Sequence, residues 1–554
     1  MHKMLEQDTI TYFENRRKQL DADYQQIQPL HKELSALMSP WSARFNLSEI
    51  DCLKSAKKII DSIPYEVRRT FRSGMASGVT NEAENWFRLS IFGLDNVNSK
   101  PVRDYLGCIE NLFRAILSAS AFYSIQPVTA DDFSVFGLGC YAVNTDRETV
   151  VSFLKIPVGS FRYEKDARRK PVTFCRNFML SASEIRNLYG EDNISDEVKK
   201  ALKDKRFSQK FELVQFVEQN ANFDKRSPWA INKRFISVVY EPKNKNKKQF
   251  LEVSGFDYMP FVIWSGDDNG ENAYPVDSCG INALPDLRQL FSMIKDKMKA
   301  IKKQLNPALK GPANIAPKTT EKVNEYYENS KDGAGVEKAY DVTIDLGNLS
   351  AEIEKKQDNI RRHFYNDILA MIISLQDKGQ RTAHEISELK EEKISLIAPA
   401  LNQEHEAISQ LFDILFEICD NGGLLPEPPE EIQGMDIKVE LVSTLAQAQK
   451  AAKLAGIERV CTLVGNLSEQ DPYVRNKINL YNVVDVYADF GNVPPEIINS
   501  TESVEEFRAK AEQAQAQQQQ QEQLLTALEK GSKIYENVGG KDLSGGALAE
   551  RFGY

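Results

Sequence analysis

The feature that most constrains the fold is an ordered series of helices and interruptions between residues 285 and 420. Residues 285–305 repeat apolar side chains at the 3.6-residue spacing of an α-helix, and Pro285 suits the first position of that helix. A section containing proline, glycine and asparagine follows over 306–347. Helical periodicity then resumes over 349–373. The pattern predicts two helices separated by an irregular insert.

A third, longer helix is expected after a short break. The second helix is expected to have Ser350 as its N-cap. The break that separates it from the third helix is the sequence DKGQ at 377–380. The third helix is expected to begin at Thr382, where TAHE forms a capping-box pattern, and to continue to about Asp420. The pair Gly422–Gly423 and the sequence PEPPEE end it.

The residue pattern between about Thr129 and Trp264 differs from that of the helical segments. Short runs of β-branched and aromatic residues alternate with charged or Gly/Pro turns, as in ETVVSFLKIPV, KPVTFCRNFML and RFISVVYEP. Within them, residues 181–204 indicate helices that start on serine caps, and IKVELVS at 437–443 alternates like a strand. Together with the helices, these runs predict an α+β protein that is mostly helical.

Composition and motifs exclude several classes of protein. Hydrophobic residues make up 42% of the chain and the net charge is −10, so the chain is an ordinary globular protein rather than a disordered or collagen-like one. No apolar run approaches the roughly 20 residues of a membrane span. The five histidines form no HExxH, the single Gly-Lys step (Gly540–Lys541) is followed by aspartate rather than Ser/Thr, and no GxSxG or GxGxxG is present. The sequence therefore predicts neither an enzyme nor a metal site or other cofactor.

Five segments, spread along the chain, form an ordered set of short motifs. The first, FRSGMASGVTNEAENWFRL, combines small residues that permit close backbone packing with the apolar anchor Trp86–Phe87. The others are GINALPDLRQL followed by LNPAL, the long segment from RTAHEISELK to LLPEPPEEI, VELVSTLAQAQKAA, and FGNVPPEIINSTESVEEFRAKAEQAQAQQQQ. In this order, the five segments resemble the head-to-tail connecting (portal) protein family of short-tailed, podovirus-type bacteriophages. The resemblance spans about residues 10–525.

The resemblance implies a non-enzymatic structural protein. Members form a ring, usually of twelve subunits, at one capsid vertex, and double-stranded DNA passes through its channel during packaging and ejection. The expected partners are the terminase large subunit, tail adaptor and tail proteins, and the major capsid and scaffolding proteins, with no membrane. The expected location is the portal vertex of the virion, with the host cytoplasm as the place of assembly.

The resemblance also implies a division of the chain. The expected parts are a wing (1–284), a first stem helix (285–305), a clip (306–348), a second stem helix (349–373), a tunnel loop (374–381), a long wing helix with a closing strand (382–444), a helical crown (445–503) and a Gln-rich C-terminal segment (504–554). That last segment has two interpretations, an ordered helical barrel or a disordered tail, because its heptad positions carry few apolar residues before Leu524.

Two groups of candidate site residues follow from this division. The expected DNA-channel residues are Lys295, Lys299, Lys302 and Lys303 of the first stem helix and Lys378, Gln380 and Arg381 of the tunnel loop. The expected residues for docking terminase or adaptor on the clip are Lys310, Lys318, Glu321 and Glu328. Cations near DNA attract its phosphates without reading sequence. The alternative for the lysines is a solvated helix face, or one that pairs with acids of the adjacent subunit.

Two other functions compete with the portal hypothesis. A packaging ATPase or an associated nuclease would need the phosphate-binding loop that the sequence lacks. A scaffolding or internal virion protein would consist of extended helices without a strand-rich block at 130–264, and would form a rod or small oligomer instead of a closed ring.

Overall fold

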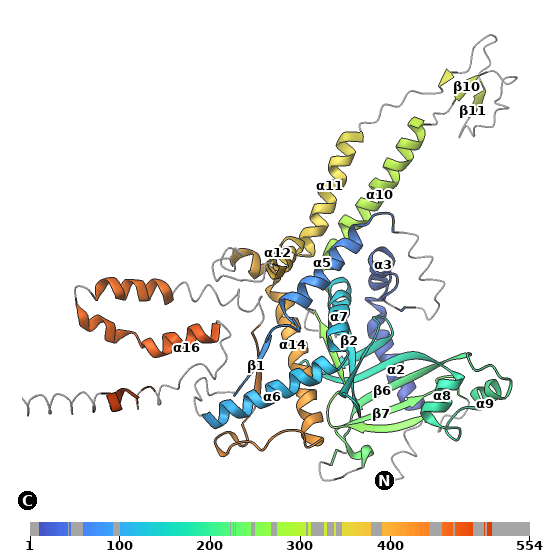
Figure 1. Ribbon diagram of the computed structural model, residues 1–554. Coiled ribbons are helices and arrows are strands. Elements are labelled where there is room, and N and C mark those ends of the chain that lie inside the picture. Colours follow the sequence, from blue (N-terminus) through green and yellow to red (C-terminus); the bar gives the residue numbers. More distant parts are fainter. Residues whose placement is uncertain are drawn as a thin grey trace, which may run out of the picture. The chain divides into compact units, whose positions relative to one another are not determined.

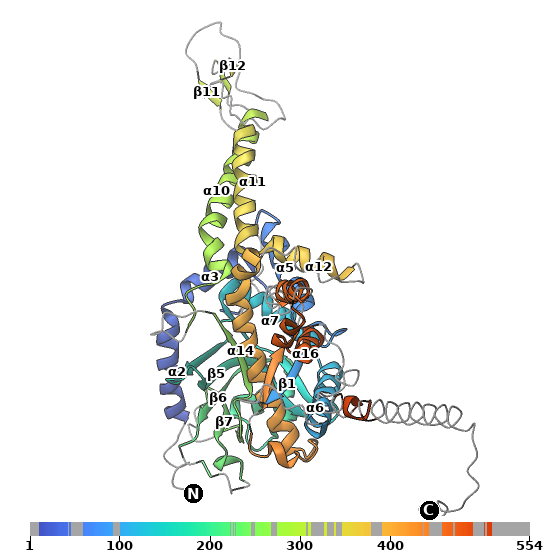
Figure 2. The same ribbon diagram turned by 90° about the vertical axis from the view of Figure 1, so that its left-hand side faces the viewer.

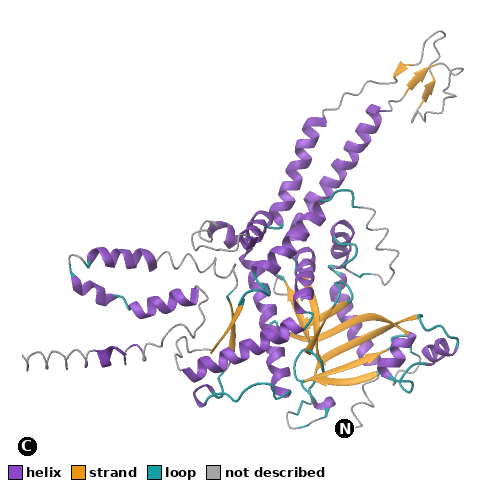
Figure 3. Cartoon of the chain, viewed as in Figure 1, coloured by secondary structure: helices purple, strands orange, loops and turns teal. Residues whose placement is uncertain are grey.

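A computed structural model places most of the chain in two compact units. Unit 1 comprises Met1–Asp95 and Asp104–Gly456, and unit 2 comprises Asn96–Arg103 and Ile457–Tyr554. The structure describes residues 10–42, 44–45, 59–91, 100–221, 223–224, 227, 229–244, 250–266, 274–305, 309–311, 326–328, 337–338, 346–377, 391–435, 437–442, 457–468, 471–490, 504, 507–511 and 513. Helices and sheets share unit 1, so the predicted α+β class is confirmed (Figure 3).

The largest sheet has five antiparallel strands in the order β4-β5-β6-β7-β8 (Figure 1). They are β4 (Phe161–Lys165), β5 (Pro171–Ser181), β6 (Lys210–Gln219), β7 (Phe235–Tyr240) and β8 (Glu252–Phe256). Alternation along β6 directs Val214 and Phe216 toward α2 (Ile10–Gln25). Leu213 instead contributes to a separate cluster with α8 (Ala182–Tyr189) and α9 (Asp196–Lys203).

The predicted serine caps of this region are confirmed. Ser181 and Glu184 form a capping box at the start of α8. The Ser195 hydroxyl accepts the backbone N–H of Val198 at the start of α9 and donates to Glu241 at 2.6 Å. The remaining short element here is the 3₁₀ turn η1 (Ala230–Asn232).

A second sheet lies at the centre of the main core. It has the order β3-β2-β9, with β2 (Leu138–Asp146), β3 (Val150–Lys155) and β9 (Phe261–Ser265). All five residues of β9, FVIWS, are buried, because helices cover it. The strand texture was expected from about Thr129, but α7 (Phe122–Phe136) continues to Phe136. Gly137 ends that helix in the left-handed conformation, with φ at 67°.

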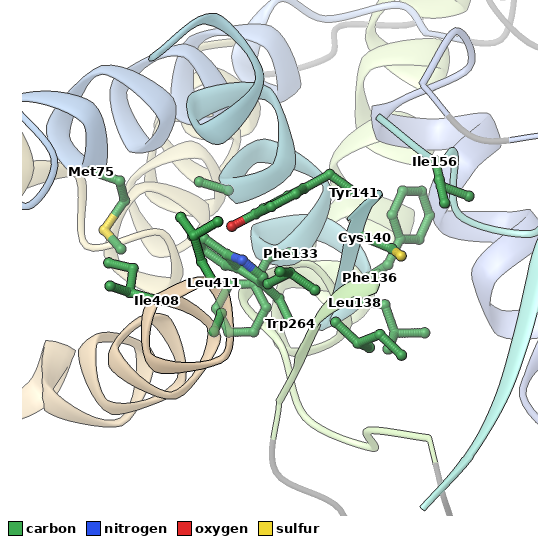
Figure 4. Packing of buried hydrophobic residues seen from close by; sticks show 14 of the residues in the cluster. Met75, Phe133, Phe136, Leu138, Cys140, Tyr141, Ile156, Trp264, Ile408 and Leu411 are labelled. Atoms are coloured by element: carbon green, nitrogen blue, oxygen red, sulfur yellow. The ribbon is translucent and has the colours of Figure 1, made fainter. Parts of the chain in front are cut away.

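Helices and one strand pair complete this core. The helices are α3 (Gln28–Met38), α5 (Ile63–Gly78), α6 (Lys100–Ala119) and α14 (Glu391–Asn421). The strand pair consists of β1 (Phe87–Ile91) and β13 (Ile437–Leu441), which are antiparallel. The 3₁₀ turn η3 (Glu430–Ile432) lies between α14 and β13 in the chain. Figure 4 shows Leu411 of α14 beside Phe133, Tyr141 and Trp264, and Ile408 of the same helix beside Met75 of α5. The predicted strand at 437–443 is confirmed over 437–441.

Two long helices differ from their predicted bounds. The first is α10 (Cys279–Leu305), so Pro285 lies inside it and not at its start. The Ser278 hydroxyl accepts the N–H of Ile281 at 3.0 Å, and this cap starts the helix before the proline. The expected helix over 349–373 is divided into α11 (Leu346–His363) and α12 (Asn366–Asp377), with Tyr365 at a φ of 53° between them. Ser350 is therefore not an N-cap; its hydroxyl donates to the carbonyl of Leu346 at 2.7 Å.

The helix ends around the predicted tunnel loop are only partly described. Helix α12 extends to Asp377, into the range 374–381, and residues 378–390, including Thr382, lie outside the described residues. The predicted end of α14 near Asp420 is confirmed. The N–H of Gly422 bonds to Ile418 and that of Leu424 to Cys419, and Gly423 has a φ of 65°.

Unit 2 is helical in its described part. It contains a helix over 457–467, the 3₁₀ segment η4 (Pro472–Lys477) and α16 (Leu480–Phe490). Most of the Gln-rich segment 504–554 lies outside the described residues. Within the part of the chain that the structure describes, every helix is too short or too polar to cross a membrane.

Gly74 permits a close approach of two helices in unit 1. A Cβ atom at Gly74 would lie 2.6 Å from Leu369 Cβ of α12, so α5 and α12 meet at backbone distance there. We expect Gly74→Ala to lower the free energy of unfolding by about 1–3 kcal/mol, although alanine favours helices by about 1 kcal/mol. Denaturant unfolding measures this, with Ser73→Ala on the exposed face as control. A stabilised Gly74→Ala protein would contradict the close approach of the two helices.

Candidate DNA-channel and docking surfaces

Four of the predicted basic residues lie on a hairpin of two antiparallel helices. Helices α10 and α11 lie side by side in two views, with the short strands β10, β11 and β12 at their far end (Figures 1 and 2). Leu287 and Leu290 of α10 are fully buried, and Ile353 and Ile360 of α11 are buried as well. The apolar stripe read from the sequence therefore forms the hairpin interface near its base.

Polar contacts fix the register of the hairpin. Asp286 accepts a bond from Lys356 Nζ at 2.8 Å and lies 3.5 Å from His363 Nε2. Lys297 Nζ donates to the Ser350 hydroxyl at 2.8 Å. The contacts of Asp286 with Lys356 and His363 were not predicted from the sequence. The seven-residue spacing of Lys356 and His363, which places both on one helix face, was the available signal.

The hairpin is attached to the rest of unit 1 by ion pairs. Arg288 donates to Glu33 of α3 at 2.7 Å, and its guanidinium holds the pKa of the Glu33 carboxyl below its usual value. Arg361 of α11 donates to Glu66 of α5 at 2.9 Å. These groups are largely exposed, so each pair adds little stability, but together they orient the helices.

Four of the predicted lysines lie on exposed positions of α10. Lys295, Lys299, Lys302 and Lys303 are exposed, whereas Lys297 turns toward α11. Lys299 Nζ lies 3.2 Å from Asp296, the acid that the sequence places among these lysines. Helical spacing places Lys295 and Lys302 on the same side of the helix, two turns apart. The structure thus gathers these four predicted residues on one helix.

The apolar stripe of α10 is also exposed toward its C-terminal end. Met298 is 52% and Leu305 74% exposed, unlike Leu287 and Leu290. The C-terminal end of α10 therefore exposes apolar side chains beside its lysines, although Ala300 between Met298 and Leu305 is buried.

The predicted docking residues are only partly described. Lys310 lies in β10 (Leu309–Gly311) and Glu328 in β11 (Tyr326–Glu328), and the sheet order is β11-β10-β12, with β12 at Glu337–Lys338. Backbone register places Lys310 opposite Tyr327 and Glu337. The structure brings Lys310 and Glu328 into one small sheet. Lys318, Glu321, Lys378, Gln380 and Arg381 lie outside the described residues.

In the described ranges, no group of three or more His, Cys, Asp or Glu side chains could hold a metal ion.

Comparison with known proteins decides the family. Residues 11–498 match the family described as bacteriophage head to tail connecting protein. The chain belongs to that family. It is 28% identical over 490 residues to the portal protein of Salmonella phage epsilon15, covering 87% of this chain and 88% of the relative. It is 27% identical over 496 residues to a protein of Bordetella phage BPP-1 described as "Probable portal protein", with the same coverages.

Family membership settles the broad class of this connecting protein. It is a structural, non-enzymatic phage protein, as the sequence predicted. Membership implies an oligomeric ring that connects to the capsid, and hence a location in the virion.

Proposed function

We propose that the chain is a portal protein: a ring at one capsid vertex through which double-stranded DNA is packaged and ejected. The observation that carries this proposal is the portal relative from phage epsilon15, which aligns with 87% of the chain. A ring of twelve subunits, with terminase, tail adaptor, capsid and scaffolding proteins as partners, follows from the same resemblance. In this proposal the α10–α11 hairpin is the stem, the sheet of β10–β12 belongs to the clip, and residues 445–503 form the crown.

The exposed lysines of α10 (Lys295, Lys299, Lys302 and Lys303), here called the lysine face, could line a channel through which DNA passes. Lys295, Lys299, Lys302 and Lys303 would face phosphates in the channel, joined by Lys378, Gln380 and Arg381 from the tunnel loop. A few exposed cations attract DNA without reading its sequence, whereas many neutralised phosphates would hold it tightly. The net charge of −10 is compatible with this local basic surface, because a moving duplex needs few and weak contacts.

The clip is the proposed docking platform. Lys310 and Glu328 would contact terminase and later the tail adaptor, with Lys318 and Glu321 in the same segment. Charged side chains of both signs at the end of the hairpin can speed the association of a partner and fix the position in which it binds. Such a contact needs no large apolar area, so one partner can be exchanged for another.

The ring itself is tested by native mass and negative-stain images of the same purified peak. A particle near twelve times 62.8 kDa with a central hole is expected. A discrete dimer or rod under all conditions, including with the scaffolding protein present, would overturn the portal proposal and favour a scaffolding or internal virion protein.

The lysine face is tested by replacing Lys302 and Lys303 together with alanine. We expect intact rings and less packaged DNA. The salt dependence of DNA binding to the ring should also fall, by about 1 in slope for each phosphate that the ring no longer neutralises. Lys200→Ala with Lys203→Ala on exposed positions of α9 is the matched control. Unchanged packaging and salt slope would assign the lysines to a solvated face.

A further inference from the structure

A carboxyl group lies in the middle of the main core of unit 1. Glu404, on α14, is 1% exposed. Its neighbours on the same helix, Ala407 and Ile408, are fully buried in the same apolar cluster. The bond that Glu404 makes is a long one, from Gln126 Nε2 of α7 to Oε1 at 3.4 Å. The other carboxylate oxygen, Oε2, has no hydrogen-bond partner in the described part of the protein.

The described groups around Glu404 are polar but carry no compensating positive charge. From α7 comes Gln126, and the two acids of that helix are engaged elsewhere, Asp131 with Arg68 and Asp132 with Lys155. From β2 comes Tyr141, whose pKa is raised well above its usual value by burial and then by the charges of Cys140 and Glu404.

The other described elements packed against this point also supply no cation. From β9 comes Trp264, and Figure 4 shows the Tyr141 hydroxyl pointing toward its indole nitrogen. On α14 itself, His405 is half-buried and Glu406 exposed. Burial raises the pKa of Glu404 to about 8, since the long bond from Gln126 offsets little of the cost of removing a carboxylate from water.

We propose that protonation of the Glu404 carboxyl group controls how firmly α14 docks on α7 and the β2–β9 strand pair. The neutral acid fits the core and can donate a hydrogen bond to a neighbouring oxygen. The carboxylate is compatible with the core only if α14 opens and lets water reach it. This inference rests on the core of unit 1 and does not depend on the channel or clip assignments.

The sign of the effect follows from proton uptake on folding. The folded pKa lies above the usual glutamate value of about 4.3, so between about pH 4 and 8 the folded protein keeps a proton that the opened one releases. Docking is therefore strongest at low pH in this range, weakens as pH rises toward about 8, and changes no further above it.

Hydrogen exchange of the full-length protein between pH 6 and 9 tests the proposal. After correction for intrinsic exchange, peptides from α14 should open about tenfold more between pH 6 and 7, and about fivefold more between pH 7 and 8. Glu404→Gln, which keeps the shape and removes the charge, should abolish that increase. Glu406→Gln, two residues away on the exposed face, should behave like the unaltered protein.

The result that would overturn the proposal is the same pH dependence in Glu404→Gln as in the unaltered protein. Circular dichroism and native mass check that each variant folds and assembles. If Glu404→Gln does not fold, Glu404→Met provides the same test, and a pH-dependent opening of α14 in that variant would equally reject the role of Glu404.

Discussion

Phe412→Ala is expected to lower the free energy of unfolding by about 3–5 kcal/mol. Phe412 lies on α14, is 1% exposed and contacts three aromatic rings at centroid distances of 6.1 Å to Trp86, 4.7 Å to Phe87 and 5.7 Å to Phe113. The expected destabilisation combines the transfer free energy of the ring with a cavity that rigid aromatic neighbours fill poorly. Edge-to-face and tilted ring contacts add about 0.5–1.5 kcal/mol per pair.

Two variants isolate the aromatic contribution in equilibrium denaturant unfolding. Phe412→Leu retains much of the volume and should cost less than the alanine variant. Leu396→Ala, at a 61% exposed position of the same helix, should change stability by at most about 0.5 kcal/mol. A Phe412→Ala protein no less stable than Leu396→Ala would show that α14 is not anchored at this point.

The burial of the aromatic pair Trp86–Phe87 could be predicted from the sequence, because it depends on local features. Trp86 and Phe87 follow a run of small residues, and in the structure both are buried and Gly74 lies against Leu369 as the run suggested. Serine caps at Ser181 and Ser195 were predictable for the same reason, since a cap and its partner are three residues apart.

Non-local pairings and local backbone changes could not be predicted in the same way. Ser90 pairs with Lys438, and no property of either strand reveals its partner 348 positions away. Helix α11 ends at His363 although neither glycine nor proline is present there. Phe364 is fully buried, and Tyr365 takes a positive φ so that α12 can pack on α5. Such a break is a tertiary effect and leaves no signal in helical periodicity.

The helix that carries the candidate lysines was predictable, but the face on which each lysine lies was not. Periodicity located the helix that carries these lysines, but it could not show that Lys297 faces α11. The structure turns Lys297 toward Ser350 because α11 packs along that side of α10. Which helix face meets a neighbour depends on the partner helix, and the sequence of α10 alone does not contain that information.

Arg68→Met is expected to lower the free energy of unfolding by about 3–5 kcal/mol, because it leaves a buried carboxylate without its cation. Arg68 Nε of α5 donates to Asp131 of α7 at 2.9 Å, and the two side chains are 12% and 10% exposed. Arg68 also donates to the carbonyl of Met38 at 2.7 Å, which joins the end of α3 to the same point. Three helices therefore depend on one guanidinium group.

The double variant Arg68→Met with Asp131→Leu separates the cost of an unpaired charge from the value of the pair. Removing both charges should recover most of the stability that Arg68→Met removes, since a buried pair replaced by apolar groups is often neutral or stabilising. Arg69→Met, the exposed neighbour, is the matched control and should change stability by at most about 0.5 kcal/mol. If the double variant is less stable than Arg68→Met, the ion pair itself stabilises the helix junction. The loss of stability in Arg68→Met would then not result from leaving the Asp131 carboxylate without a cation.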